Sequence, residues 1–182
     1  MKQILLICSF MWFYGCSNRV NQVNHKSNVE IANEFIDAFY SFNRDSLLST
    51  LSFAKKSQPR ILYYQKWAEC GNYKIIRRHD CILKNDSVVI CPVTVSDDLI
   101  GALGINFNVT DTFRLIIRKG QIRWVKTSSN DPELYHQAKK WVKQNRPELI
   151  KEPCRGIREG GPTPCECVRA MIKGFEEFKA SK

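Results

Sequence analysis

The stretch FRLIIRKGQIRWV, residues 113–125, contains two runs of apolar and β-branched residues on either side of a short polar turn. Lys119 and Gly120 occupy this turn, and glycine readily adopts the backbone conformations that tight turns require. Two such runs separated by so few residues are typical of antiparallel strands. The stretch therefore predicts a β-hairpin that turns at Lys119-Gly120.

Further strands are expected upstream of this hairpin. A second tight turn is expected at Asn85-Asp86, again between apolar runs. A longer connection, SDDLIGALGINFN, separates the two hairpins at residues 96–108. The expected strands cover residues 73–83, 87–95, 109–118 and 121–128.

Helical patterns lie on both sides of the strands. Ser27 and Glu30 form a capping-box pattern, and the apolar residues that follow recur at helical spacing. Pro59 and Pro132 each stand in the first turn of a helical segment. The expected helices cover residues 27–42, 44–52, 59–71, 131–142 and 163–178. Helices followed by a meander of strands predict an α+β fold rather than a doubly wound parallel sheet.

The N-terminus resembles a bacterial lipoprotein signal. An apolar run from Ile4 to Gly15 follows one early lysine, and it is shorter than the roughly 20 residues that a membrane span needs. Polar residues begin directly after Cys16, which the resemblance makes the lipid-bearing first residue of the mature protein. An ordinary cleaved signal peptide is the alternative, although no small-x-small cleavage site lies nearby. We expect a signal peptide at residues 1–15 and a flexible tether at 16–27.

The remaining chain is expected to form one domain, residues 28–182, with a disulfide-linked extension from about residue 148. Export places the domain in an oxidising compartment, where an even number of cysteines predicts disulfides. Without Cys8 in the signal and Cys16, six of the eight cysteines remain.

The spacing of these six cysteines limits how they can pair. Cys81 and Cys91 flank the predicted turn symmetrically, so they are expected to bond across the hairpin. Cys165 and Cys167 point to different sides of one helix and cannot bond each other. They are expected to bond Cys70 and Cys154, in either order. No C-x-x-C is present and the histidines are scattered, so no metal site is expected.

Several residues together resemble the nuclear transport factor 2-like, or SnoaL-like, superfamily over about residues 28–147. The matching residues are Phe35, Asn43, Asp45, Phe113, Gly120 and Ile122. The resemblance implies a curved antiparallel sheet wrapped around the N-terminal helices, a cone-shaped, cystatin-like arrangement. Its open mouth would hold a small apolar ligand, and the open sheet face would form a homodimer. The aromatic residues that would line the pocket are Tyr63, Tyr64, Trp67, Phe113 and Trp124. Core packing is the competing interpretation for the last three.

Catalytic chemistry has few candidates in this sequence. Asp111 stands where the ketosteroid isomerase branch of the superfamily carries a protonated aspartate. The tyrosine that this branch has in its first helix is replaced by Phe35, and residues 46–68 contain no acid that could serve as the general base. An arrangement of Asp111, His79 and Tyr64 is the remaining catalytic possibility. No cofactor is expected.

The chain is strongly basic, with a formal charge of +10 from 28 basic and 18 acidic residues. Such a charge favours acidic partners, but export argues against nucleic acid. The basic residues of the C-terminal third are interpreted as a solvated face that lies against anionic envelope surfaces: Lys139, Lys140, Lys143, Arg146, Lys151, Arg155 and Arg158.

These observations predict a lipid-anchored, disulfide-stabilised protein of the bacterial cell envelope, on the periplasmic or outer surface side. Its expected role is non-catalytic binding or interaction. The alternative is an envelope enzyme, of isomerase or hydrolase type, acting on a small hydrophobic or carbonyl-bearing substrate.

Overall fold

A computed structural model describes residues 26–155 and 165–182. The expected signal peptide and nearly all of the expected tether lie outside these residues. The described elements are α1 (Asn28–Tyr40), α2 (Arg44–Thr50), α3 (Gln58–Cys70), β1 (Lys74–Arg78), β2 (Ile82–Asn85), β3 (Val88–Ser96), α4 (Asp98–Leu103), β4 (Val109–Arg118), β5 (Gln121–Ser129), α5 (Glu133–Asn145), α6 (Pro147–Lys151) and α7 (Cys165–Ala180). The fold is α+β, as the sequence predicts.

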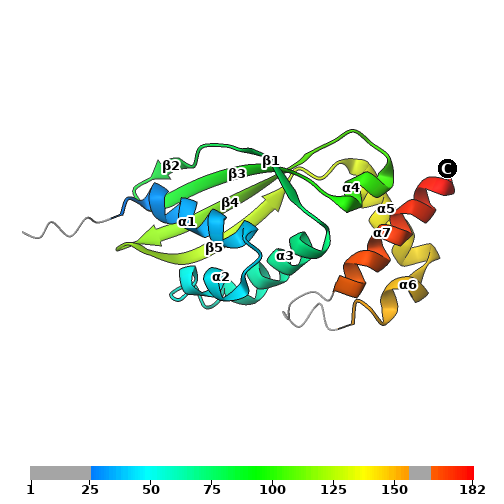
Figure 1. Cartoon of the computed structure of the whole chain (residues 1–182), viewed down its shortest axis with the longest axis horizontal. Coiled ribbons are helices and arrows are strands. Elements are labelled where there is room, and N and C mark those ends of the chain that lie inside the picture. Colours follow the sequence, from blue (N-terminus) through cyan, green and yellow to red (C-terminus); the bar gives the residue numbers. More distant parts are fainter. Residues whose placement is uncertain (1–25, 156–164) are drawn as a thin grey trace, which may run out of the picture.

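The strands form one curved antiparallel sheet in the order β1-β3-β4-β5, with β2 also paired to β3 (Figure 1). The predicted hairpin at residues 113–125 is part of β4 and β5. Lys119 and Gly120 both have positive φ, 53° and 69°, which is the turn geometry that matches the right-handed twist of paired strands. A register shift between Ile116 and Ile117 marks a bulge near this turn.

The expected strand at residues 73–83 is two strands, which is a correction. β1 pairs with the C-terminal half of β3, and β2 pairs with its N-terminal half. Between them the backbone N–H of His79 donates to the carbonyl of Pro92, at 3.2 Å. In an antiparallel sheet, the N–H and C=O of one residue point toward the same neighbouring strand. Pro92 has no N–H, so it accepts a hydrogen bond from His79 but cannot donate one to the same side. The ladder is interrupted there.

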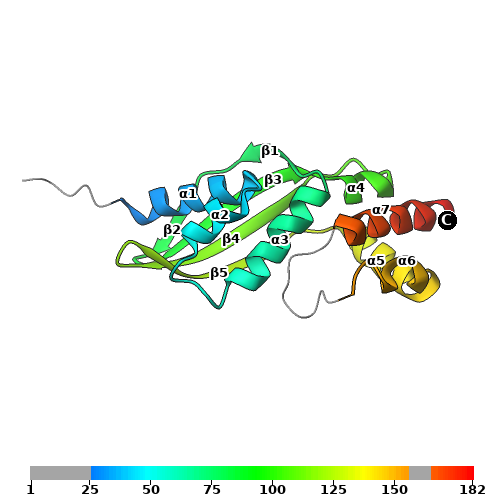
Figure 2. The ribbon, with the colours of Figure 1, turned by 60° about the horizontal axis from the view of Figure 1, so that its bottom comes forward.

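Helices α1, α2 and α3 cover one face of the sheet (Figure 2). Side chains alternate along β3 and β4, and the set facing these helices includes Val93, Val95 and Phe113. The ring of Phe113 lies 4.8 Å from that of Phe39 and 5.6 Å from that of Phe35, centre to centre. All three phenylalanines are fully buried, so aromatic side chains fill the interior of the cone.

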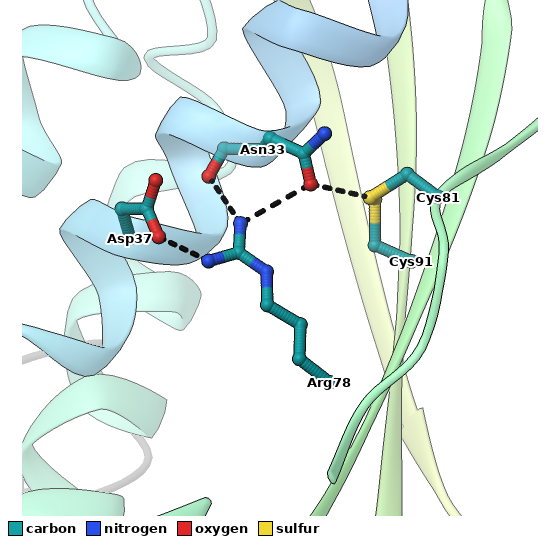
Figure 3. Close-up of polar contacts among 5 residues, drawn as sticks. All are labelled: Asn33, Asp37, Arg78, Cys81 and Cys91. Atoms are coloured by element: carbon teal, nitrogen blue, oxygen red, sulfur yellow. Dashed lines mark hydrogen bonds and ion pairs between the residues drawn. A yellow bond between two sulfur atoms is a disulfide. The ribbon is translucent and has the colours of Figure 1, made fainter.

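Helix α1 begins with the predicted capping box, in which Ser27 and Glu30 exchange hydrogen bonds with each other's backbone N–H groups. Arg78 fastens the same helix to β1, as Figure 3 shows. Its guanidinium pairs with Asp37 and donates to the carbonyl and side-chain oxygens of Asn33, at 3.0 and 3.1 Å. The side-chain oxygen of Asn33 lies 3.4 Å from the Sγ of Cys81. This polar cluster joins helix, edge strand and disulfide at one point.

The connection at residues 96–108 contains a short helix, α4, that the sequence analysis did not assign. The Asp97 side chain accepts a hydrogen bond from the N–H of Ile100, at 2.9 Å, and Gly104 ends the helix with φ of 69°. Helices α4, α5, α6 and α7 lie together beyond one end of the sheet (Figure 1). The sequence patterns also did not predict helix α6, which has five residues.

Candidate functional site

Three disulfides are present in the described residues. Cys81 and Cys91 are bonded across the edge of the sheet, in the pairing that the hairpin predicts. Of the two orders that the sequence left open, the structure has Cys70–Cys165 and Cys154–Cys167. The first bond joins the end of α3 to the start of α7, and the second joins the segment after α6 to α7. Such bonds fit an oxidising compartment outside the cytosol.

The two C-terminal disulfides hold the helices that enclose a cleft of about 380 Å³. We call it the helical cleft, and its lining residues come from α3, from the chain before α5, from α5 and α6, from the segment after α6, and from α7. They are Tyr63, Tyr64, Trp67, Asp131, Tyr135, Lys139, Lys143, Ile150, Cys154, Cys167 and Met171. This volume lies in the range of small-molecule sites, about 300 to 1,000 Å³.

Helix α3 supplies the aromatic wall of the helical cleft. Tyr63 and Trp67 are four residues apart, so they lie one above the other on the same helix face. Their rings stack with 6.3 Å between the centres and 29° between the planes. Gln65 points the other way and donates to the carbonyls of Ala38 and Phe39, which holds α3 against α1.

The charged groups of the cleft come from α5 and the residues just before it. Asp131, Lys139 and Lys143 line it. The Lys139 ammonium lies 5.4 Å from the centre of the Tyr135 ring, close enough for a cation–π contact. Burial lowers the pKa of Lys139, with a smaller contribution from the Lys143 charge, while Asp131 opposes the shift. Lys139 thus corrects the interpretation of this basic segment as a solvated face, whereas Lys143 is exposed at the cleft.

A buried carboxylate lies behind the aromatic wall. Asp111 on β4 has no exposed surface, and its two oxygens accept hydrogen bonds from the hydroxyls of Tyr64 and Tyr40. The Tyr40 bond measures 3.0 Å. Burial raises the pKa of Asp111 to about 6, although the two tyrosine hydrogen bonds act in the opposite direction. Burial and the nearby Asp111 also raise the pKa values of both tyrosines.

Asp111 is not among the residues that line the helical cleft. Tyr64 is, but while Asp111 is ionised its hydroxyl hydrogen is directed at that carboxylate. While Asp111 is ionised, Tyr64 and Asp111 therefore offer the cleft neither an unpaired carboxylate nor an unpaired hydroxyl hydrogen. The structural effect of Asp111 is to hold Tyr64 and Tyr40 to the sheet.

His79 does not join Asp111 and Tyr64, which corrects the expected arrangement. Its ring nitrogen bonds the hydroxyl of Thr94, at 2.9 Å. Thr94 alternates with Val93 and Val95, which face the helices, so its side chain points to the opposite face of the sheet. Val93 is paired directly with Asp111, whose carboxylate is therefore on the helix side. His79 and Asp111 are separated by the sheet.

Two of the five aromatic residues expected in the pocket lie elsewhere. Phe113 is fully buried in the core beside Phe35 and Phe39, because the interior of the cone is filled. Trp124 is 39% exposed and lines a separate hollow that also includes Phe53. It pairs with Ile116 on the outer face of the sheet, one residue before the bulge. The other three, Tyr63, Tyr64 and Trp67, line the helical cleft rather than the interior of the cone.

Sequence reasoning missed Tyr40, Asp131, Tyr135, Ile150 and Met171 as site residues. Tyr40 supplies the tyrosine hydroxyl that the sequence analysis looked for at the position of Phe35. The other four depend on how α5, α6 and α7 pack on α3. The sequence signal for this packing was the pair of cysteines at the start of α7. Because they were expected to bond Cys70 and Cys154, α7 had to lie close to both.

Among residues 26–155 and 165–182, no group of three or more histidine, cysteine or acidic side chains is placed to hold a metal ion. The helices of these two segments also include none with the length and hydrophobicity needed to cross a bilayer.

No family model and no curated protein matches the chain. A solved structure that does match is a protein of unknown function with a cystatin-like fold from Xanthomonas campestris. It is 20% identical, and the match covers 58% of this chain and 92% of that one, with a TM-score of 0.45.

Proposed function

We propose that this chain is an exported, lipid-anchored protein of the bacterial cell envelope that binds a small molecule in the helical cleft and has no catalytic role. The observation that carries the proposal is the cleft itself. Its walls are mainly aromatic and apolar, and two disulfides brace the helices around it. Ligand sites in proteins commonly combine such walls with a few placed polar groups.

The anchor is proposed from the sequence. Cys16 follows the short apolar run directly, and three disulfides in the mature chain agree with export. Intact mass of the chain purified from envelopes tests this part. We expect an N-terminus at Cys16 that carries lipid. An unmodified N-terminus at another residue would overturn the anchor.

We also propose that the sheet and α1 to α3 are related to the nuclear transport factor 2-like, or SnoaL-like, superfamily. The order of three helices and an antiparallel meander supports this. So do two of the matching residues, since Asn43 caps α2 and Gly120 makes the turn between β4 and β5.

The binding proposal is tested by extracting whatever small molecule co-purifies with the chain and identifying it by mass spectrometry. A variant with a narrowed cleft, Ile150→Trp, is the comparison. Trp124→Phe, outside the cleft, is the matched control. We expect one compound in wild type and in the control, and its loss from Ile150→Trp. Equal recovery from all three proteins would place the compound outside the cleft.

An envelope enzyme is the alternative, and one observation favours it. Tyr64 lines the cleft and also donates a hydrogen bond to Asp111. The pKa of Asp111 is raised to about 6, so its carboxyl group gains and loses a proton near neutral pH. Protonated Asp111 can donate to Tyr64, whose own hydrogen is then free to reach a ligand. Conversion of the co-purified compound by wild type, but not by Tyr64→Phe, would establish this alternative over pure binding.

A further inference from the structure

Two lysines of α5 face the helical cleft. Lys139 and Lys143 are four residues apart, so they lie on one face of the helix and about 6 Å apart along its axis. Both line the cleft, Lys139 half-buried and Lys143 exposed, whereas Lys140 is exposed and does not line it. The lysine charge at the cleft therefore comes from the middle and the last turn of α5.

Lys139 lacks a counter-ion within the described part of the chain. It is half-buried, and no carboxylate there lies within 4 Å of its ammonium. Its described neighbours are the face of Tyr135, a second lysine one turn on, and Asp131, whose charge offsets only part of the lowering of the Lys139 pKa. A partly desolvated ammonium that makes no direct ion pair is unfavourable, and a bound anion would relieve it.

Most of the remaining lining is apolar. The stacked rings of Tyr63 and Trp67 form one wall, while Ile150, Met171 and the Cys154–Cys167 disulfide form others. Such surfaces hold a hydrocarbon or flat aromatic body by removing it from water. The ligand therefore needs an apolar body as well as an anionic group.

Asp131 limits the negative charge that a ligand can carry. It lines the cleft just before α5 begins, and its charge acts on Lys139. A ligand with a second anionic group would meet this like charge in a poorly solvated site. The two lysines and one carboxylate therefore favour a ligand with a single negative charge.

The geometry points to an amphipathic acid with a single anionic group as the ligand of the helical cleft. Lys139 and Lys143 hold the anion, and the apolar body lies against Tyr63 and Trp67. This inference rests on the proposed binding function and adds the chemical class of the ligand.

Two fluorescent probes with the same aromatic body test it. One is 8-anilino-1-naphthalenesulfonate, which carries one negative charge, and the other is uncharged N-phenyl-1-naphthylamine. Both are titrated into the processed chain with its disulfides intact. The variants are Lys139→Gln, Lys143→Gln and, as a matched control, Lys140→Gln.

We expect wild type to bind the anionic probe about tenfold more tightly than the neutral one, which corresponds to one well-placed charge interaction. Lys139→Gln and Lys143→Gln remove most of this preference and leave the neutral probe within about twofold, while Lys140→Gln changes neither. Decanoate displaces the neutral probe better than decanol or decanedioate does.

The possible failures are distinct. Tight binding of both probes, with the same affinities in all four proteins, overturns the anionic ligand and leaves the binding function standing. Stronger displacement by decanedioate than by decanoate overturns the single charge. Binding of neither probe by wild type overturns the proposed function itself.

Discussion

Asp111 shows how burial and hydrogen bonding compete at a single carboxyl group. Loss of water around the ionised form raises its pKa to about 6, and the Tyr64 and Tyr40 hydroxyls offset only part of that effect. Asp97, the N-cap of α4, has its pKa raised to about 6 by the same cause, and hydrogen bonds from Ile100 and Leu99 oppose it. Both groups bind protons more readily in the folded chain than in the unfolded chain.

This sets the sign of a pH dependence. Between about pH 4 and pH 7 the folded chain holds more protons on these groups than the unfolded chain does, so the free energy of unfolding rises as the pH falls. Asp111→Asn should reduce that rise by roughly 2 kcal/mol. Urea unfolding at pH 4.5 and 7.5, with disulfides intact, measures it.

Asp97→Asn is the matched comparison, since asparagine caps helices as well as aspartate does. It should remove a similar share of the pH dependence, and the double variant should remove both shares. If the free energy of unfolding of Asp111→Asn changed with pH as much as that of wild type, the folded state would not raise the proton affinity of Asp111.

At the residue scale, the sequence predicted Asp111 and Tyr64 as candidates but not their partner. Tyr40 is the last residue of α1, five positions beyond the phenylalanine that the family resemblance aligned with the missing tyrosine. Which residue of a helix reaches a strand depends on the crossing of the two elements. Lys139 was misinterpreted for a related reason, because a polar helix face can still be partly covered by another part of the chain.

At the scale of elements, α7 lies against α5 at a point where no side chain would fit. A Cβ on Gly174 would lie 2.5 Å from the Cγ2 of Val142. The two helices can approach this closely only with glycine at that position. Both helices contribute to the lining of the helical cleft, so their spacing sets its width.

Gly174→Ala should therefore destabilise the fold by about 1 to 3 kcal/mol and weaken probe binding, since the added methyl forces α5 and α7 apart. Gly101→Ala in α4 is the control. Apart from its chain neighbours and the backbone of its own helix, no atom lies within 4 Å of a Cβ built there, so alanine should stabilise the chain by up to about 1 kcal/mol. Chemical denaturation and titration of N-phenyl-1-naphthylamine measure both effects. A Gly174→Ala protein as stable as wild type would contradict this packing.

The disulfides make a second prediction for these elements. Cys70–Cys165 joins residues 95 apart and holds α7 to α3, whereas Cys81–Cys91 joins residues 10 apart at the sheet edge. Replacing Cys70 and Cys165 by alanine should cost about 3 to 5 kcal/mol and abolish probe binding.

Replacing Cys81 and Cys91 should cost less and leave probe binding unchanged, because that bond lies away from the cleft. Equal loss of binding in both double variants would show that the cleft depends on the whole fold rather than on the attachment of α7.

Long elements were predictable from their patterns, and short ones were not. The spacing of apolar residues, together with turn and helix-start residues, predicted the β4–β5 hairpin and the helices α1, α3 and α5. Helix α4 has only six residues, and a glycine inside it weakens its pattern. The break between β1 and β2 is caused by Pro92 on a neighbouring strand, and the sequence of the broken segment carries no sign of it.

At the scale of the molecule, the sheet with α1 to α3 occupies one end and the helices α4 to α7 the other (Figure 1). The chain enters the described structure at the start of α1, at the end away from α5 and α7 (Figure 1). In the proposed anchoring, the tether is attached at the sheet end of the domain, and the helical cleft lies at the other end.

The most direct test of ligand binding in the helical cleft uses Trp67, whose ring forms part of its wall. In the processed chain with Trp124→Phe and Trp141→Phe, Trp67 is the tryptophan that remains. Titration with N-phenyl-1-naphthylamine should quench its fluorescence saturably at one probe per chain. Ile150→Trp adds a tryptophan, so its effect is followed by the fluorescence of the probe, and it should weaken probe binding. Unquenched Trp67 fluorescence at probe concentrations that saturate the protein would contradict binding in the cleft.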